Sequence, residues 1–168
     1  MKNTEPIVNF DEKPIYNKDQ IKEILPHRDP FLFIDEIRDL GNDFIVGIKF
    51  VKEEEDYFKG HFPGSPVMPG VLQLESMAQV GGVLILSTVK DPENYLTYLM
   101  KIDNAKFEHQ AAADESLWQR VHLVVAATGE DVSDTAISIK SKDINPAPLI
   151  DMGLQTYNSP TKAKENES

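Results

Sequence analysis

The chain has 168 residues, of which 40% are hydrophobic and 27% are charged, so it can form one packed domain. Its formal net charge of −11 argues against binding nucleic acid, because that function uses a broad basic face. The chain contains no cysteine, which excludes disulfides, thiolate metal sites and cysteine nucleophiles.

The composition also disfavours a metal site and a membrane span. The longest apolar segment, residues 71–89, contains two glutamines and a glutamate, so it is a poor candidate to cross a membrane. The first residues lack the apolar run of a signal peptide, and we expect a cytoplasmic protein. No metal site is expected, because no H-x-H or H-E-x-x-H spacing occurs among the four histidines: His27, His61, His109 and His122.

The first predicted element is a short helix. Asn17 and Gln20 form the pattern of a capping box at its start, and Pro26 ends it. Two strands follow, over residues 31–40 and 44–52, and their spacing predicts a hairpin. In the second strand, alternation places four apolar residues on one face: Phe44, Val46, Ile48 and Phe50.

The apolar segment 71–89 is too long for an ordinary strand. Its apolar residues surround the helix axis, which predicts a helix buried on nearly all sides. Four strand-like runs follow without helices between them, around residues 96–102, 121–125, 137–139 and 150–154. We therefore predict an α+β protein in which one antiparallel sheet wraps around a long central helix.

Both ends of the chain are polar and lack apolar anchors. We predict a flexible N-terminal segment over residues 1–16 and a disordered C-terminal tail over residues 158–168. The residues between them, 17–157, show no internal repeat and no interdomain linker, so we expect a single domain there.

The sequence GHFPGSPVMPGVLQLESMAQ, residues 60–79, places polar groups where the buried helix begins. Pro69 and Gly70 precede the helix, and the free N–H groups and positive dipole end there suit a developing oxyanion. Glu75 interrupts the apolar helix shortly afterwards, and a carboxyl group taken out of water favours its neutral, proton-donating form. His61 lies in a loop stiffened by prolines and is a candidate base near neutral pH.

The candidate acid has a neighbour on the same helix face. Gln79 lies one turn after Glu75 and can hydrogen-bond its carboxyl group. A lone buried glutamate is often structural, and a lone histidine more often lies on the surface or in the core than in a catalytic site. A base, an acid and an amide donor within 15 residues together favour catalysis over these structural interpretations.

Three segments resemble the 3-hydroxyacyl-[acyl-carrier-protein] dehydratases of type II fatty acid synthesis, the Z-type enzymes. They are ILPHRDPFLFIDEI at residues 24–37, the stretch at residues 60–79, and YLMKIDNAKF at residues 98–107. The resemblance covers about residues 20–107 and weakens sharply afterwards. It implies the hot-dog fold, a sheet wrapped around a central helix, which agrees with the elements predicted above.

The resemblance implies a role for each matching residue. His61 removes the proton alpha to the thioester, Glu75 protonates the departing hydroxyl group, and the N–H of Gly70 polarises the thioester carbonyl. Because dehydratase-isomerase relatives carry aspartate where this chain has glutamate, dehydration without double-bond isomerisation is expected. Three further residues are assigned to the substrate tunnel or to the layer around the catalytic groups: Gln79, Tyr98 and Phe62. For Tyr98, a structural role as a core aromatic on a strand is an equally good interpretation.

The resemblance also implies partners. In this family the histidine and the glutamate of one site come from different subunits, so we expect a homodimer or a trimer of dimers. The substrate is expected on the phosphopantetheine arm of an acyl carrier protein. The reaction requires no cofactor, and none is expected.

The chain departs from the family after Phe107, where the usual basic residues are missing. At a net charge of −11, long-range attraction to an acidic carrier protein is unfavourable. Docking then depends on a small local patch, around Arg120 or Lys106, or the carrier is unusual. His27 and Arg28 are shared with the family and are interpreted as structural, because the sequence shows no acid–base partner beside them.

Two alternative functions stay open. A hot-dog protein can instead hydrolyse thioesters, which would release a free thiol. The chain could also be a catalytically weak or inactive partner subunit, or an acyl-binding protein, that pairs with an active homologue. The altered C-terminal third favours this second alternative, whereas the intact His61, Gly70 and Glu75 disfavour it.

Overall fold

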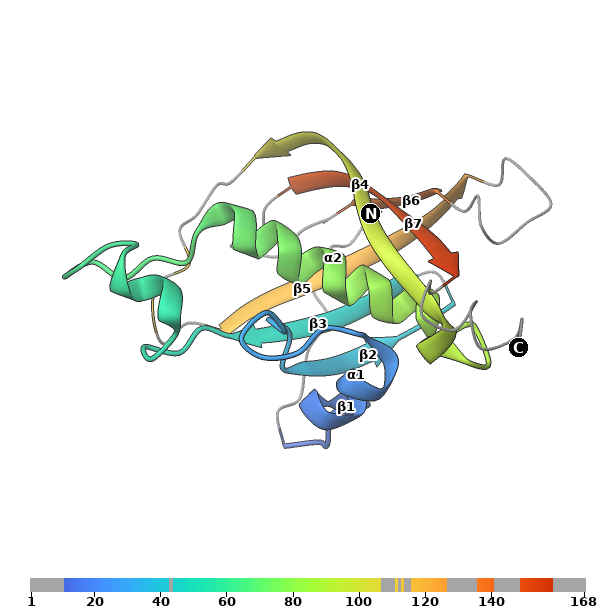
Figure 1. The fold of residues 1–168 in the computed structure, drawn as a ribbon, viewed down its shortest axis with the longest axis horizontal. Coiled ribbons are helices and arrows are strands. Elements are labelled where there is room, and N and C mark those ends of the chain that lie inside the picture. The colour runs from blue at the N-terminus through green and yellow to red at the C-terminus, as the bar shows by residue number, and fades with distance from the viewer. Residues whose placement is uncertain are drawn as a thin grey trace, which may run out of the picture.

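In the computed structural model of this chain, one seven-stranded sheet surrounds a long helix, α2 (Gly70–Leu86) (Figure 1). All strand pairs are antiparallel, in the order β1-β2-β3-β5-β6-β7-β4. This arrangement confirms the predicted α+β class and hot-dog fold. The structure describes residues 11–42, 44–106, 111, 113, 116–126, 136–140 and 149–158.

The predicted elements occur in the predicted order: a short helix, two strands, the buried helix and four more strands. The structure adds a short strand before the first helix, β1, and two short 3₁₀ helices, η1 (Asp56–Lys59) before α2 and η2 (Pro92–Asn94) before β4. The strand predicted over residues 31–40 begins only at residue 36. The remaining elements are β1 (Tyr16–Asn17), α1 (Lys18–Ile24), β2 (Glu36–Leu40), β3 (Phe44–Phe50), β4 (Tyr95–Lys106), β5 (Ser116–Ala126), β6 (Ala136–Lys140) and β7 (Leu149–Asn158).

The capping box at the start of α1 is confirmed. The Asn17 side-chain oxygen accepts a hydrogen bond from the Gln20 amide, and the Gln20 side-chain oxygen accepts one from the Asn17 amide, both at 3.0 Å. The helix ends at Ile24, and Leu25 is already extended. Pro26 explains this end, because the residue before a proline is disfavoured in the helical conformation.

The hairpin of β2 and β3 is confirmed, and α2 packs against β3. It packs at Gly47, where a Cβ atom would lie only 2.4 Å from Cγ2 of Val80. Residues 45–49 are all buried, so both faces of this strand are covered. The absence of a side chain at Gly47 lets the helix approach the sheet closely.

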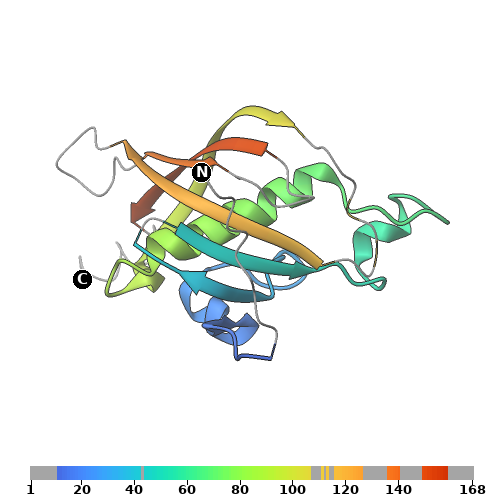
Figure 2. The same ribbon diagram turned by 180° about the vertical axis from the view of Figure 1, so that it is seen from behind.

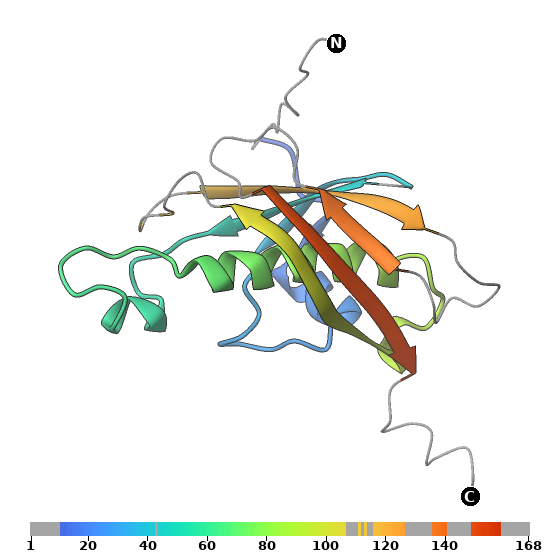
Figure 3. The same ribbon diagram turned by 90° about the horizontal axis from the view of Figure 1, so that it is seen from above.

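The core forms around α2, whose residues are buried on nearly all sides, as predicted. The helix contacts strands β3, β5, β7 and β4. Figure 2 shows α2 behind β3 and β5. In the view of Figure 3, α2 runs along one face of the sheet. Ile21 of α1 and Leu25, the residue after this helix, join the core, so the short helix covers part of the side that the sheet leaves open. Each such fully buried side chain contributes about 1.5–3 kcal/mol.

Within the part of the chain that the structure describes, no helix is long and apolar enough to cross a membrane. Some predictions lie outside the described residues. They concern residues 1–10 and 159–168 and the side chains of Lys106 and Arg120. The boundaries of the single domain, residues 17 and 157, stay predictions.

Candidate active site

The loop between η1 and α2 projects beyond the N-terminal end of the helix and carries His61 (Figures 1 and 3). Phe62 and Ser65 exchange two backbone hydrogen bonds, of 3.2 and 2.9 Å, across a tight turn. Gly64 has a φ of +81° in this turn, a conformation that glycine adopts without strain. The Val67 amide closes the loop by donating to the carbonyl of His61 at 3.2 Å.

The imidazole of His61 is anchored at one nitrogen. Nδ1 lies 2.7 Å from the carbonyl oxygen of Val67. Because a carbonyl oxygen only accepts hydrogen bonds, Nδ1 carries the proton in the neutral ring. Nε2 is then unprotonated and can accept a proton. Phe62 stacks on the ring with 3.9 Å between centroids, and this residue is 53% exposed.

Gly70 is the first residue of α2, after Pro69 at the N-cap. The amides of Leu72 and Gln73 both donate to the Pro69 carbonyl, at 2.9 and 3.2 Å. The amides of the first helical residues have no carbonyl partner within the helix, and the helix dipole adds positive potential there. This end of the helix can therefore stabilise a developing negative charge.

Glu75 projects from α2 with its side chain 22% exposed. The predicted hydrogen bond from Gln79 is present, with 2.9 Å between Gln79 Nε2 and Glu75 Oε1. Gln79 is buried and also bonds the extended segment before β2. Its Nε2 donates to the Phe31 carbonyl at 2.8 Å, and its Oε1 accepts from the Phe33 amide at 2.9 Å. These bonds fix the amide that holds the carboxyl group.

His27 also lies beside Glu75, which corrects the statement that it has no acid–base partner. Its Nε2 is 3.6 Å from Glu75 Oε1. Sequence reasoning missed this contact because it joins residues 48 positions apart. Burial lowers the pKa of His27, and Arg28 lowers it further, whereas Glu75 raises it; the net direction is down. The ring is therefore neutral near pH 7.

Glu75 and His27 line a cavity of about 120 Å³. Gln79 and Gly82 of α2 and Thr97 and Tyr98 of β4 contribute to the same wall, and Tyr98 is 47% exposed. The structure thus brings together three predicted residues: Glu75, Gln79 and Tyr98. The described residues that line this cavity do not include three others: His61, Phe62 and Gly70.

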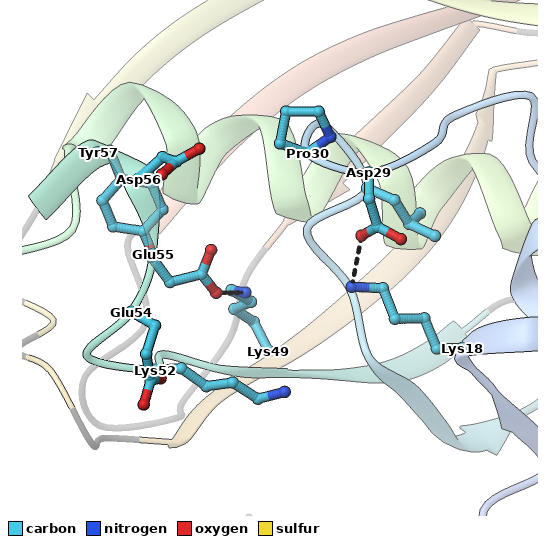
Figure 4. A pocket seen from close by; sticks show the side chains of 10 residues that line it. Lys18, Asp29, Pro30, Lys49, Lys52, Glu54, Glu55, Asp56 and Tyr57 are labelled. Atoms are coloured by element: carbon cyan, nitrogen blue, oxygen red, sulfur yellow. Dashed lines mark hydrogen bonds and ion pairs between the residues drawn. The ribbon is translucent and has the colours of Figure 1, made fainter.

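A second, larger cavity of about 340 Å³ lies beside η1 and the loop after α1 (Figure 4). Two of its lysines face carboxylates: Lys18 Nζ is 3.0 Å from Asp29 Oδ1, and Lys49 forms an ion pair with Glu55. Burial alone lowers the pKa of Lys18, but the bond to Asp29 and the charge of Asp35 outweigh it, so the net pKa is raised. None of the predicted site residues lines this cavity. Among the described residues, no group of three metal-ligating side chains occurs.

The family model and the related proteins that match this chain point to the same family. The family model described as a FabA-like domain matches residues 25–140. A bifunctional enzyme LpxC/FabZ of Porphyromonas gingivalis is 48% identical over 119 residues, which cover 71% of this chain and 26% of that protein. The chain therefore spans about a quarter of the length of this bifunctional relative.

Two further similarities cover most of the chain. The 3-hydroxyacyl-[acyl-carrier-protein] dehydratase FabZ of Bartonella henselae is 38% identical over 138 residues, 82% of this chain and 89% of that protein. The dehydratase heterocomplex ApeI:P from Xenorhabdus doucetiae superimposes with a TM-score of 0.63 at 16% identity, covering 88% of this chain and 97% of that chain. At that identity, the second similarity supports the fold alone.

Proposed function

Because the chain belongs to the FabA-like domain family, we propose that it dehydrates 3-hydroxyacyl thioesters carried by an acyl carrier protein to trans-2-enoyl thioesters. Relatives that bear the name of this dehydratase support the proposal. The proposal includes action in the cytoplasm, and the acyl carrier protein is its expected partner.

One observation carries the proposal: a buried apolar helix presents a single carboxyl group to a cavity, held there by Gln79. Such a group is suited to act as the general acid. In the proposed reaction His61 Nε2 takes the proton from C2, and the electrons of that C–H bond form the C2–C3 double bond. The C3–O bond breaks as Glu75 gives its proton to the hydroxyl group, which leaves as water. The Gly70 amide stabilises the negative charge on the thioester oxygen.

We further propose that two chains build each site, with His61 from one and Glu75 from the other. The separation of His61 from the cavity beside Glu75 supports this arrangement. Among the residues that the structure describes, β4 lies at the end of the sheet and pairs with β7, and no strand lies along its other edge. Tyr98 and Ile102 on β4 are 47% and 41% exposed. An open edge with exposed apolar side chains suits pairing with a second copy.

A spectroscopic assay tests the activity. The purified chain is given a 3-hydroxyacyl thioester on an acyl carrier protein, and the conjugated enoyl thioester is followed by its absorbance. The wild type should turn over, whereas His61→Ala and Glu75→Gln should each lose at least about a hundredfold in rate, the usual contribution of a general acid or base. Equal rates in all three proteins would contradict the assigned roles.

The same assay separates the alternative functions. Release of a free thiol without enoyl formation would indicate a thioesterase. No turnover by the chain alone, with turnover restored by a co-purifying homologue, would indicate a partner subunit.

A further inference from the structure

We propose that His27 is a positioning residue for Glu75. Together with Gln79 it fixes oxygen Oε1 of the carboxyl group, which leaves Oε2 to carry the proton given to the substrate hydroxyl. This inference rests on the proposed function, in which Glu75 is the acid.

Two nitrogen atoms lie near the same oxygen of the Glu75 carboxyl group. Gln79 Nε2 lies 2.9 Å from Oε1 of Glu75, and His27 Nε2 lies 3.6 Å from the same oxygen. At 3.6 Å the second contact is longer than a hydrogen bond and acts as an electrostatic contact between the ring N–H and the oxygen. Both nitrogen groups therefore face Oε1.

His27 is held on a fixed segment. The Arg28 guanidinium donates from Nη1 to the carbonyl oxygens of Leu25 and His27, at 2.8 and 2.7 Å. The Arg28 carbonyl in turn accepts from the amides of Phe31 and Leu32, at 2.8 and 3.0 Å. A side chain on a segment with four such bonds is restricted before the substrate arrives.

The charge state suits the role. Two charged groups act on the imidazole, Glu75 on α2 and the neighbouring Arg28, and Tyr98 on β4 lines the same cavity. Nδ1 is buried and has no hydrogen-bond partner among the described residues, whereas Nε2 faces a carboxyl oxygen. The neutral tautomer with its proton on Nε2 is therefore favoured, and its N–H points at Glu75.

This contact strengthens during the reaction. In the proposed step the Glu75 carboxyl group gives its proton to the substrate hydroxyl, and it is left with a full negative charge that the N–H groups of His27 and Gln79 stabilise. An interaction that is stronger after proton transfer raises kcat more than it lowers KM. If His27 had a purely structural role, its loss would not affect kcat more than KM.

Two substitutions of similar size test the proposal in the assay above. His27→Gln keeps an amide N–H close to the position of Nε2, whereas His27→Met fills the space without a donor. We expect His27→Met to lose about tenfold in kcat, the scale of one hydrogen bond to a charged group, with KM within about twofold of wild type. His27→Gln should retain at least about a third of the wild-type kcat. Equal kcat values in the two variants, whether high or low, would overturn the proposal.

A second readout does not need turnover, so it separates this proposal from the proposed function. The ring of His27 is titrated by NMR in the wild type and in Glu75→Gln. The titration is done without substrate, where a charge on Glu75 raises the pKa of His27, so removal of that charge should lower the pKa further. An unchanged His27 titration would contradict the contact even if the enzyme is active. Absence of enoyl formation by the wild type, with the shift present, would instead contradict the function.

Discussion

The side-chain amide of Gln79 lies 2.9 Å from the carboxyl group of Glu75, one turn apart on the same buried helix. The amide also satisfies the Phe31 carbonyl and the Phe33 amide, so it joins the helix to the segment before β2. One side chain thus serves both stability and the placement of the candidate acid. This dual role leads to the first prediction.

Gln79→Met should lower the free energy of unfolding by about 2–3 kcal/mol, because it leaves buried backbone groups without partners. Gln73→Met is the matched control on the same helix. Gln73 is equally buried, but its amide makes one long bond of 3.3 Å to the Met68 carbonyl and its Oε1 has no partner among the described residues. Its replacement should cost less than about 1 kcal/mol. Urea denaturation measures both, and equal losses would contradict the role of Gln79.

Gly47→Ala should destabilise the chain by about 1–3 kcal/mol, since the new methyl group would overlap Val80. Gly60→Ala is the control, because a Cβ atom there meets nothing within 4 Å. Adding Val80→Ala to Gly47→Ala should recover part of the loss, so the pair is tested as a double-mutant cycle. Additive losses would show that the helix does not approach the sheet at Gly47.

Lys49→Met should destabilise the chain by about 3 kcal/mol. Lys49 is 2% exposed and lies between Glu55 and Asp35, and its removal leaves the carboxylate of Glu55 without its cation. Lys59→Met removes an exposed ion pair with Asp56 and should leave stability nearly unchanged. Thermal denaturation at equal protein concentration compares the two. A similar effect of both substitutions would contradict the burial of the Lys49 pair.

Stability should fall as the pH drops below about 6.5, the ordinary pKa of histidine, because burial lowers the pKa of His27 in the folded chain. Between its folded and unfolded pKa values the unfolded chain binds more protons, so acid favours unfolding. His27→Gln removes this group and should flatten the dependence below about pH 6.5. Unfolding free energies measured across this range check the prediction. Identical slopes in the two proteins would contradict a buried neutral His27.

The sequence predicts features that depend on neighbouring residues. The capping box of Asn17 and Gln20, the end of α1 before Pro26 and the bond between Gln79 and Glu75 all follow from local spacing, and the structure confirms them. A helix apolar on all sides also indicates its own burial, as α2 shows.

The features that sequence reasoning missed depend on contacts between distant segments. The contact of His27 with Glu75 joins the loop after α1 to the middle of α2, which no periodicity reveals. The packing of α2 on Gly47 was hidden because β3 is buried on both faces, so alternation did not identify the side that faces the helix.

The central claim is that His61 of one chain and Glu75 of another complete one site. Coexpression of His61→Ala and Glu75→Gln chains with different affinity tags tests it, because a mixed dimer contains one site with both residues intact. Double-tag purification isolates the mixed species, whose rate of enoyl formation is compared with that of each variant alone. We expect the mixed dimer to reach about half of the wild-type rate while both parent variants are nearly inactive. A mixed dimer no more active than its parents would contradict the shared site.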